Sequence, residues 1–217
     1  QTLAPIAANS VTANGAGGAD RIHFNIAGAG THTITLSAAL PGIVDAVVIN
    51  AATESDFAGT PLVVLNGAGA VNIGLSLLPG SAGSTVRGLV IQRFTQDGID
   101  ISGSNGNTVA GNWIGLNAAG TGGAGNQQGV NLGNANNNTI GGSSAADRNV
   151  ISANSGQGIS ITTDNGSSNG NLVRGNYIGT SAAGTAAVGN GSNGIGVFNG
   201  ANGNTIGGAV AGAGNVI

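Results

Sequence analysis

Short runs of alternating apolar and polar residues follow one another along the chain, separated by Gly, Asn, Pro or Ser. In the first part of the chain, runs at 22–26, 33–36, 46–50, 62–66 and 71–75 predict strands, because alternation places every second side chain on the same face. No window shows helical periodicity over more than about two turns. The pattern therefore predicts an all-β chain.

From residue 84 the runs recur with a period of about 30 residues. A Gly-Ile motif begins at residues 98, 129, 158 and 194, and an Asn motif begins at 107, 138, 171 and 204. A third motif, Asn-Val-Ile, stands at 149–151 and 215–217. Three strand motifs per repeat predict a β-solenoid of about six turns with three short strands in each. We expect residues 1–20 to form an approach segment, 21–83 the opening turns, and 84–217 the regular repeats.

The Gly-Ile motif indicates which side chains point into the coil. Its second and fourth positions are branched and apolar in all four copies, while the third is Asp100, Asn131, Ser160 and Gly196. Aliphatic columns are therefore expected to stack inside, with the third position facing water.

The Asn motif predicts a second structural feature. Asn107, Asn138, Asn171 and Asn204 should lie above one another about 4.8 Å apart, where side-chain amides can bond as a ladder. Asn and Gly also tolerate the left-handed backbone conformation expected at corners between strands. The abundance of both residues is thus explained without a ligand.

Two longer excursions, after Trp113 and after Tyr177, match each other at an offset of 64 residues. The two aromatic residues are expected to lie two turns apart, about 10 Å. They are candidates for a platform on which sugar rings stack. The favoured interpretation is that each anchors its own loop against the sheet.

Composition narrows the possible partners. The formal net charge is −3, all five basic residues are Arg, and only 6% of residues are charged, so we expect no nucleic-acid partner. Cys and Met are absent. No apolar run is long enough for a membrane span, and no signal peptide is recognisable. Gln1 suggests a processed or excised fragment, and the final motif, cut at Ile217, suggests that the natural chain continues or that another copy stacks there.

The motifs at 138–142 and 204–208 (Asn-Thr-Ile-Gly-Gly), 149–154 (Asn-Val-Ile-Ser-Ala-Asn) and 175–180 (Gly-Asn-Tyr-Ile-Gly-Thr) resemble those of right-handed parallel β-helix repeat proteins of bacterial cell surfaces. The resemblance covers roughly residues 18–217. It implies a right-handed coil and an extracellular or cell-surface setting, in a group that includes adhesins and structural surface proteins.

Parallel β-helices also serve as polysaccharide lyases, hydrolases and epimerases, so we searched for catalytic groups. Hydrolysis of a glycosidic bond needs two carboxylates at one site, and Asp97 and Asp100 are the best local pair. The equivalent positions of other turns carry no carboxylate, so two solvated surface residues are the favoured interpretation. Arg87 and Arg174 occupy the same place in the Asn motif and are candidates for contacting a sugar acid, although solvent-facing structural roles are favoured.

Other ionisable residues suggest no site. Asp147 and Arg148 are interpreted as a weak surface ion pair. His23 and His32 lack a third ligand at a spacing suited to a metal. We expect no metal and no cofactor.

These observations predict a non-catalytic extracellular structural or adhesive β-helix module that stacks end to end into a filament, with copies of itself or surface glycans as partners. The alternative is a polysaccharide-binding or polysaccharide-processing β-helix that uses Asp97, Asp100, Arg87 or Arg174. Ice binding is a third possibility, but it calls for regular Thr-x-Thr columns, which the chain suggests only at Thr33/Thr35 and at the Thr121/Thr185 pair.

Overall fold

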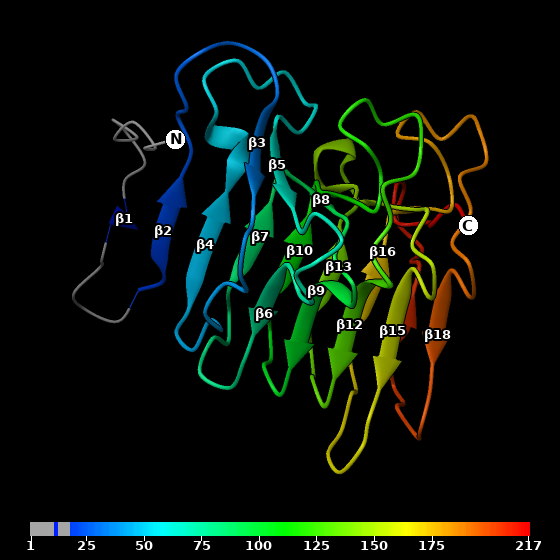
Figure 1. The fold of residues 1–217 in the computed structure, drawn as a ribbon. Helices are drawn as coiled ribbons and strands as arrows, with labels where there is room; N and C mark the ends of the chain where they lie inside the picture. The colour runs from blue at the N-terminus through cyan, green and yellow to red at the C-terminus, as the bar shows by residue number, and fades with distance from the viewer. Residues whose placement is uncertain (1–10, 13–17) are drawn as a thin grey trace.

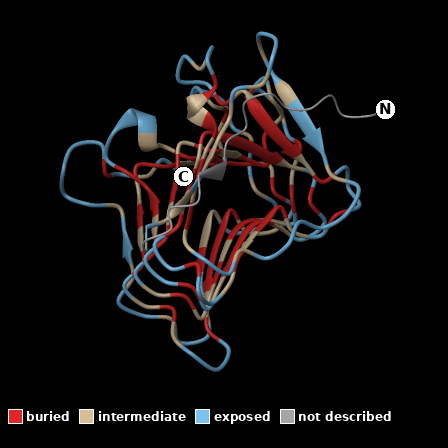
Figure 2. Ribbon diagram, turned by 90° about the vertical axis from the view of Figure 1, so that its left-hand side faces the viewer, coloured by how far each residue is buried: buried red, intermediate tan, exposed pale blue. Residues whose placement is uncertain are grey.

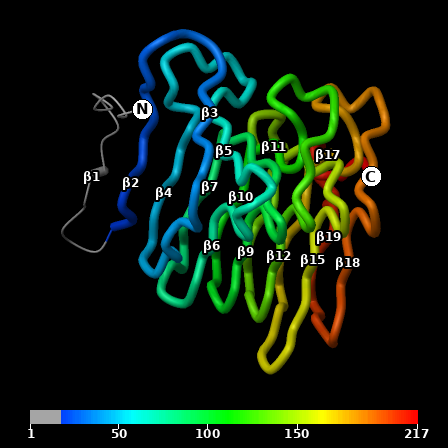
Figure 3. The backbone as a smooth tube through the Cα atoms, viewed as in Figure 1, coloured from blue at the N-terminus to red at the C-terminus, as the bar shows by residue number. Residues whose placement is uncertain are grey.

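A computed structural model describes residues 11–12 and 18–217, so most of the predicted approach segment lies outside the described residues. Short strands stack in three sheets around a common interior (Figure 1), and the backbone trace follows the coil from one end to the other (Figure 3). The fold is a parallel β-helix of about six turns with three strands in each, which confirms the prediction from the repeat. We call each turn a rung. The right hand of the coil, implied by the resemblance, stays a prediction.

Sheet A is the longest of the three. In spatial order it contains β1 (Val11–Thr12), β2 (Asp20–His23), β4 (Val47–Asn50), β7 (Thr85–Arg87), β10 (Thr108–Ala110), β13 (Thr139–Gly141), β16 (Leu172–Arg174) and β19 (Thr205–Ile206). All neighbours are parallel except β1, which pairs antiparallel with β2. The antiparallel strand therefore covers the first edge of this sheet.

Sheets B and C complete each rung. Sheet B contains β3 (His32–Thr35), β5 (Val63–Asn66), β8 (Leu89–Gln92), β11 (Trp113–Ile114), β14 (Val150–Ile151) and β17 (Tyr177–Ile178). Sheet C contains β6 (Leu75–Leu77), β9 (Asp97–Ser102), β12 (Gln128–Gly133), β15 (Ile159–Thr162) and β18 (Ile195–Val197). Two 3-10 helices, η1 (Ala51–Thr53) and η2 (Ala145–Asp147), lie in the connections.

The core follows the alternation read from the sequence. Ile99 and Ile101 lie in register with Val130 and Leu132 on the next rung, and all four side chains are fully buried. Buried residues line the inside of all three sheets (Figure 2). Stacked aliphatic columns thus supply the hydrophobic driving force along the coil.

The strand expected at 71–75 is misplaced. The backbone amides of Ala70 and Val71 donate to the Gly67 carbonyl in a turn, and β6 begins only at Leu75. The apolar residues at 71 and 73 have the spacing of a strand, but Val71 belongs to a turn and its side chain is buried there. The other four runs predicted in this part of the chain each overlap a strand.

Three asparagine ladders run along the corners of the coil. In the predicted one, the side-chain amide of Asn107 donates to Asn138 Oδ1 at 2.9 Å, and the links to Asn171 and Asn204 measure 3.1 and 3.0 Å. A second ladder joins Asn112, Asn149, Asn176 and Asn215, and a third joins Asn126, Asn154 and Asn190. The sequence pattern pointed to only the first of these.

Each ladder link has the same two donors. The backbone amide and the side-chain amide of one Asn both donate to the side-chain oxygen of the Asn on the next rung, as for Asn107 and Asn138. All ladder residues except the last of each ladder are buried, so their hydrogen bonds replace contacts with water that these side chains have lost. The left-handed conformation expected of the ladder residues belongs instead to the residues before them, such as Gly106 (φ 68°) and Asn137 (φ 57°).

Candidate functional site

The two carboxylates singled out from the sequence lie on the outer face of sheet C. Asp97 and Asp100 both belong to β9, and Asp100 lies in a column between Ser76 of β6 and Asn131 of β12. The column continues with Ser160 and Gly196. No further carboxylate extends this column on the later rungs, as the sequence comparison predicted.

Asp100 is not the solvated surface residue that we expected, because its side chain is only 7% exposed. Its carboxylate accepts hydrogen bonds from Asn131 Nδ2 at 2.9 Å, from Ser102 Oγ at 3.1 Å and from Ser76 Oγ at 3.4 Å. Neighbours on three strands therefore solvate the charge in place of water. The third position of the Gly-Ile motif is outward-facing but covered.

Asp97 has the opposite environment. Burial, with a smaller contribution from the charge of Asp100, raises the pKa of Asp97 from 3.8 to about 7. Its Oδ1 is buried without a hydrogen-bond partner among the described residues, and so is Oε1 of its register partner Gln128. When Asp97 is protonated, its carboxyl group gains an O–H donor, which the unpartnered oxygens of Asp97 and Gln128 otherwise lack. This agrees with the raised pKa of Asp97.

The arginines expected near a groove lie on another sheet. Arg87 ends β7 and Arg174 ends β16, both in sheet A. The structure thus separates them from Asp97 and Asp100 rather than joining all four in one site. Nε of Arg174 is buried with no hydrogen-bond partner among the described residues.

The predicted pair between Asp147 and Arg148 is wrong. Asp147 faces Arg87 instead, with 3.4 Å between Asp147 Oδ1 and Arg87 Nη2. Arg148 lies with its guanidinium 4.2 Å from the centre of the Tyr177 ring, and its Nε donates to the Gly175 carbonyl at 3.2 Å. Asp147 and Arg148 are adjacent in sequence and precede β14, but their side chains contact residues on different rungs.

Trp113 and Tyr177 lie in one column on the outer face of sheet B, with Val150 between them. Each ring packs against the glycine of its own excursion. A Cβ added at Gly120 would lie 2.8 Å from the Trp113 ring, and one added at Gly184 would meet the Tyr177 ring. This placement agrees with the favoured role as loop anchors.

The excursions cover a face that is itself apolar. Val64, Val90 and Val150 of the outward column of sheet B are all at most 2% exposed. The two excursions also contact each other, since the amide of Ala182 donates to the Gly120 carbonyl at 2.9 Å. The outer face of sheet B is therefore buried at β5, β8 and β14.

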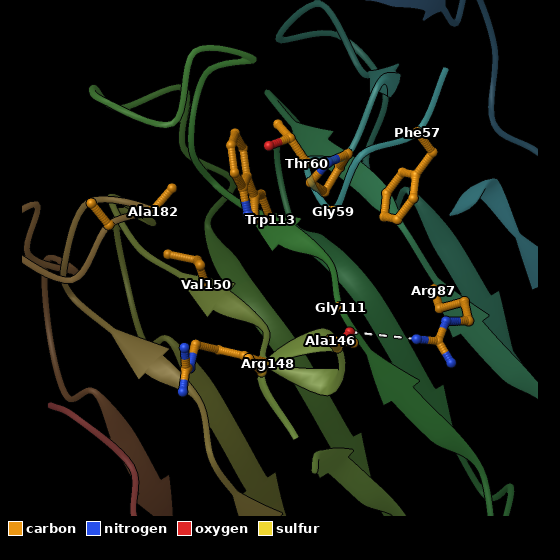
Figure 4. Close-up of a pocket in the computed structure, with 13 residues that line it drawn as sticks. Phe57, Gly59, Thr60, Arg87, Gly111, Trp113, Ala146, Arg148, Val150 and Ala182 are labelled. Atoms are coloured by element: carbon orange, nitrogen blue, oxygen red, sulfur yellow. Dashed lines mark hydrogen bonds between the residues drawn. The ribbon is translucent and has the colours of Figure 1, made fainter. Parts of the chain in front are cut away.

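A cavity of about 380 Å³ remains within this cover (Figure 4). Trp113 and Val150 of sheet B line it, and Arg87 and Arg148 lie on either side of Ala146. Phe57, Gly59, Thr60 and Pro61 form the opposite wall, and Gly111, Ala145, Ala182 and Ala183 complete the lining. The volume falls within the range of about 300–1,000 Å³ typical of small-molecule sites.

Sheet C carries a shallow hollow of about 460 Å³ on its outer face. Its lining is uncharged: Gln128, Asn131, Gln157, Ser160, Thr162, Phe198 and Asn199. Neither Asp97 nor Asp100 is part of that lining, so the carboxylates stand beside the hollow and not within it.

Two other kinds of site find no support among residues 11–12 and 18–217. No group of three or more His, Cys, Asp or Glu is placed to hold a metal ion. Within the same residues, no helix has the length and apolar character that crossing a membrane requires.

The chain matches no protein-family model, no curated protein and no solved structure.

Sequence reasoning missed Arg148 and Phe57, which both line the cavity. The position of Arg148 near Tyr177 could have been predicted from the sequence. Aligning Asn149 with Asn176 pairs Val150 with Tyr177, and Arg148 lies two residues before Val150. Phe57 gave no such signal, since the loop after η1 has no counterpart in the repeat.

Proposed function

We propose that this chain is a non-catalytic structural or adhesive β-helix module of the bacterial cell surface or extracellular space. The observation that carries the proposal is the set of three buried asparagine ladders, which run along the corners of the whole regular repeat. A scaffold of this kind holds its outer faces in fixed positions, which is what a surface module needs. The extracellular bacterial setting rests on the resemblance of the repeat motifs.

The placement of ionisable residues supports a non-catalytic role. Acid–base cleavage of a glycosidic bond needs two carboxyl groups flanking one bond, and uronate chemistry also needs a nearby cation. Asp97 and Asp100 are on sheet C, while Arg87 and Arg174 are on sheet A. Asp100 is also enclosed by three hydrogen-bond donors.

Stacking of copies end to end is the mode of assembly that we propose. Seven parallel strands of sheet A at about 4.8 Å spacing give a stack of only about 30 Å, so one copy is a short prism. A fibre therefore needs further rungs or further copies. Because β1 covers the first edge of sheet A, the joint would run through sheets B and C.

A turnover assay tests the non-catalytic role. The protein is incubated with neutral and uronate-containing polysaccharides between pH 5 and pH 8, a range chosen to bracket the pKa of Asp97 near 7. Reducing ends and unsaturated products are then measured. We expect neither to form. Turnover that is lost in Asp97→Asn and kept in Asp164→Asn, a change at an exposed carboxylate, would overturn the proposal in favour of a polysaccharide-processing enzyme.

A further inference from the structure

The cavity on sheet B combines features that the structural role does not require. Besides Trp113, Val150, Gly111 and Arg87, its lining comes from three separate segments: the loop after η1, the helix η2 with Arg148, and the second excursion (Figure 4). A cover that served only to bury sheet B would close over Trp113 as fully as it closes over Val150. The segments leave about 380 Å³ open there instead.

The charge of this cavity is positive in a chain whose formal net charge is −3. Two of the five arginines line it, and its lining includes no Asp or Glu. Arg87 has one acidic neighbour, Asp147, at 3.4 Å, which is longer than the roughly 2.7–2.9 Å of a strong charge-assisted hydrogen bond. That contact leaves Arg87 available to a better-placed anion.

Arg148 is held without a carboxylate. The face of the Tyr177 ring and the Gly175 carbonyl fix its guanidinium, and the neighbouring carboxylate of Asp147 pairs with Arg87 instead. A guanidinium fixed through its face and its Nε keeps its terminal N–H groups for a ligand, in the fork geometry that matches a carboxylate.

Aromatic and neutral groups define the rest of the ligand. Trp113 and Phe57 offer apolar ring surfaces, and Thr60 offers a hydroxyl. A sugar ring has apolar C–H faces that pack on an aromatic ring and hydroxyl edges that bond to polar groups. A flexible acidic peptide would gain little from the indole.

We propose that this cavity binds a segment of an acidic polysaccharide built from uronic-acid units, with one carboxylate at the guanidinium group of Arg87, another at that of Arg148, and a sugar ring on Trp113. The inference rests on the adhesive part of the proposed function and names the ligand class for it. No bond is made or broken in this binding.

The chain provides its own reporter for the test, because Trp113 is its single tryptophan. Trigalacturonate is titrated into the protein at low salt, and binding is followed by Trp113 fluorescence and by calorimetry. The fully methyl-esterified trisaccharide keeps the rings and loses the charges. Poly-glutamate keeps carboxylates without rings, and a sulfated trisaccharide replaces the carboxylate by sulfate.

We expect trigalacturonate to change the fluorescence and to bind at least about tenfold more tightly than its methyl ester, because charge-assisted bonds are lost in the ester. Arg87→Gln and Arg148→Gln should each weaken binding by about tenfold. Arg21→Gln, the same change at an exposed arginine on β2, should stay within about twofold of wild type. Circular dichroism checks that each variant keeps the β-helix.

Several outcomes would overturn the inference: no binding of trigalacturonate, equal binding of its ester, equal binding by the Arg87→Gln variant, or stronger binding of poly-glutamate or of the sulfated trisaccharide. None of these affects the turnover assay, so failure of the glycan site and failure of the non-catalytic role are told apart.

Discussion

At the scale of single residues, the asparagines carry the specificity of the coil. Each ladder side chain with an Asn on both neighbouring rungs accepts two hydrogen bonds from the preceding rung and donates to the next, as Asn138 does between Asn107 and Asn171. A buried amide without these partners would cost far more than the net gain of the bonds themselves. The ladders therefore favour one register of stacked rungs over shifted ones.

Replacing Asn138 by Ala tests the ladder directly. Two donors of Asn107 lose their acceptor, and the Ser104 carbonyl loses a donor. We expect the free energy of unfolding to fall by about 2–4 kcal/mol, measured by guanidinium denaturation. Asn202→Ala is the control, because that side chain is exposed and donates only to the nearby Gly200 carbonyl, so its loss should stay under about 0.5 kcal/mol. Equal losses of unfolding free energy in the two variants would show that the ladder hydrogen bonds do not stabilise the fold more than a surface hydrogen bond does.

Asp97 makes stability depend on pH in a direction unusual for a carboxyl group. Its pKa is about 7 in the folded protein, above the 3.8 of an unperturbed group. Between these values the folded chain binds a proton that the unfolded chain has released, so the free energy of unfolding declines as pH rises from 3.8 to about 7 and levels off above that.

Asp97→Asn should flatten this decline, and Asp164→Asn should leave it as in wild type. The measurement is a series of denaturant unfolding curves from pH 4 to pH 8. A wild-type protein whose stability rises steadily over that range would contradict the burial argument for Asp97.

At the scale of elements, the two excursions repeat one small design. Each is closed by an antiparallel bridge, Leu116 with Gly123 and Thr180 with Ala187, and each packs its glycine on the aromatic residue that precedes it. The aromatic ring and the glycine thus fix the loop as a unit. The walls of the cavity depend on that arrangement.

Gly184→Ala should loosen the second excursion. Gly184 has φ 72°, and an added Cβ would overlap the Tyr177 ring. We expect a loss of about 1–2 kcal/mol from the left-handed backbone alone. Hydrogen exchange should quicken over residues 179–189 more than in the core strands. Gly189→Ala in the same loop has no atom within 4 Å of the new Cβ, and comparable exchange in both variants would disprove the anchoring role.

The sequence predicted the elements wherever the repeat was regular. The Gly-Ile motif located β9, β12, β15 and β18, because inward aliphatics and outward small residues alternate in all four. The prediction from apolar alternation was wrong at Val71, because a turn there buries an apolar side chain just as a strand would. The cavity could not be predicted, because Phe57 and Arg87 are brought to Trp113 by stacking of rungs and not by spacing within a motif.

At the scale of the whole molecule, the two ends differ from the middle. Apolar side chains that are buried in the inner rungs become exposed, with Ile34 at 38% in the first rungs and Val197 at 42% in the last. An apolar cavity of about 210 Å³ lies within the first rungs. Exposed strand edges and apolar surface gain from burial, which further rungs of a longer chain or the proposed second copy would provide.

Val197→Lys tests whether stacking uses sheet C. Val197 ends β18 at the edge of that sheet, and a lysine there would place a charge where the next copy must pack and pair. Sedimentation velocity over a range of concentrations should show self-association of the wild-type protein and a monomer for Val197→Lys. Val210→Lys adds the same charge at an exposed position after β19, outside the strands, and should associate like wild type. A wild-type protein that stays monomeric at every concentration would exclude stacking, and association that persists in Val197→Lys would place the joint elsewhere than on sheet C.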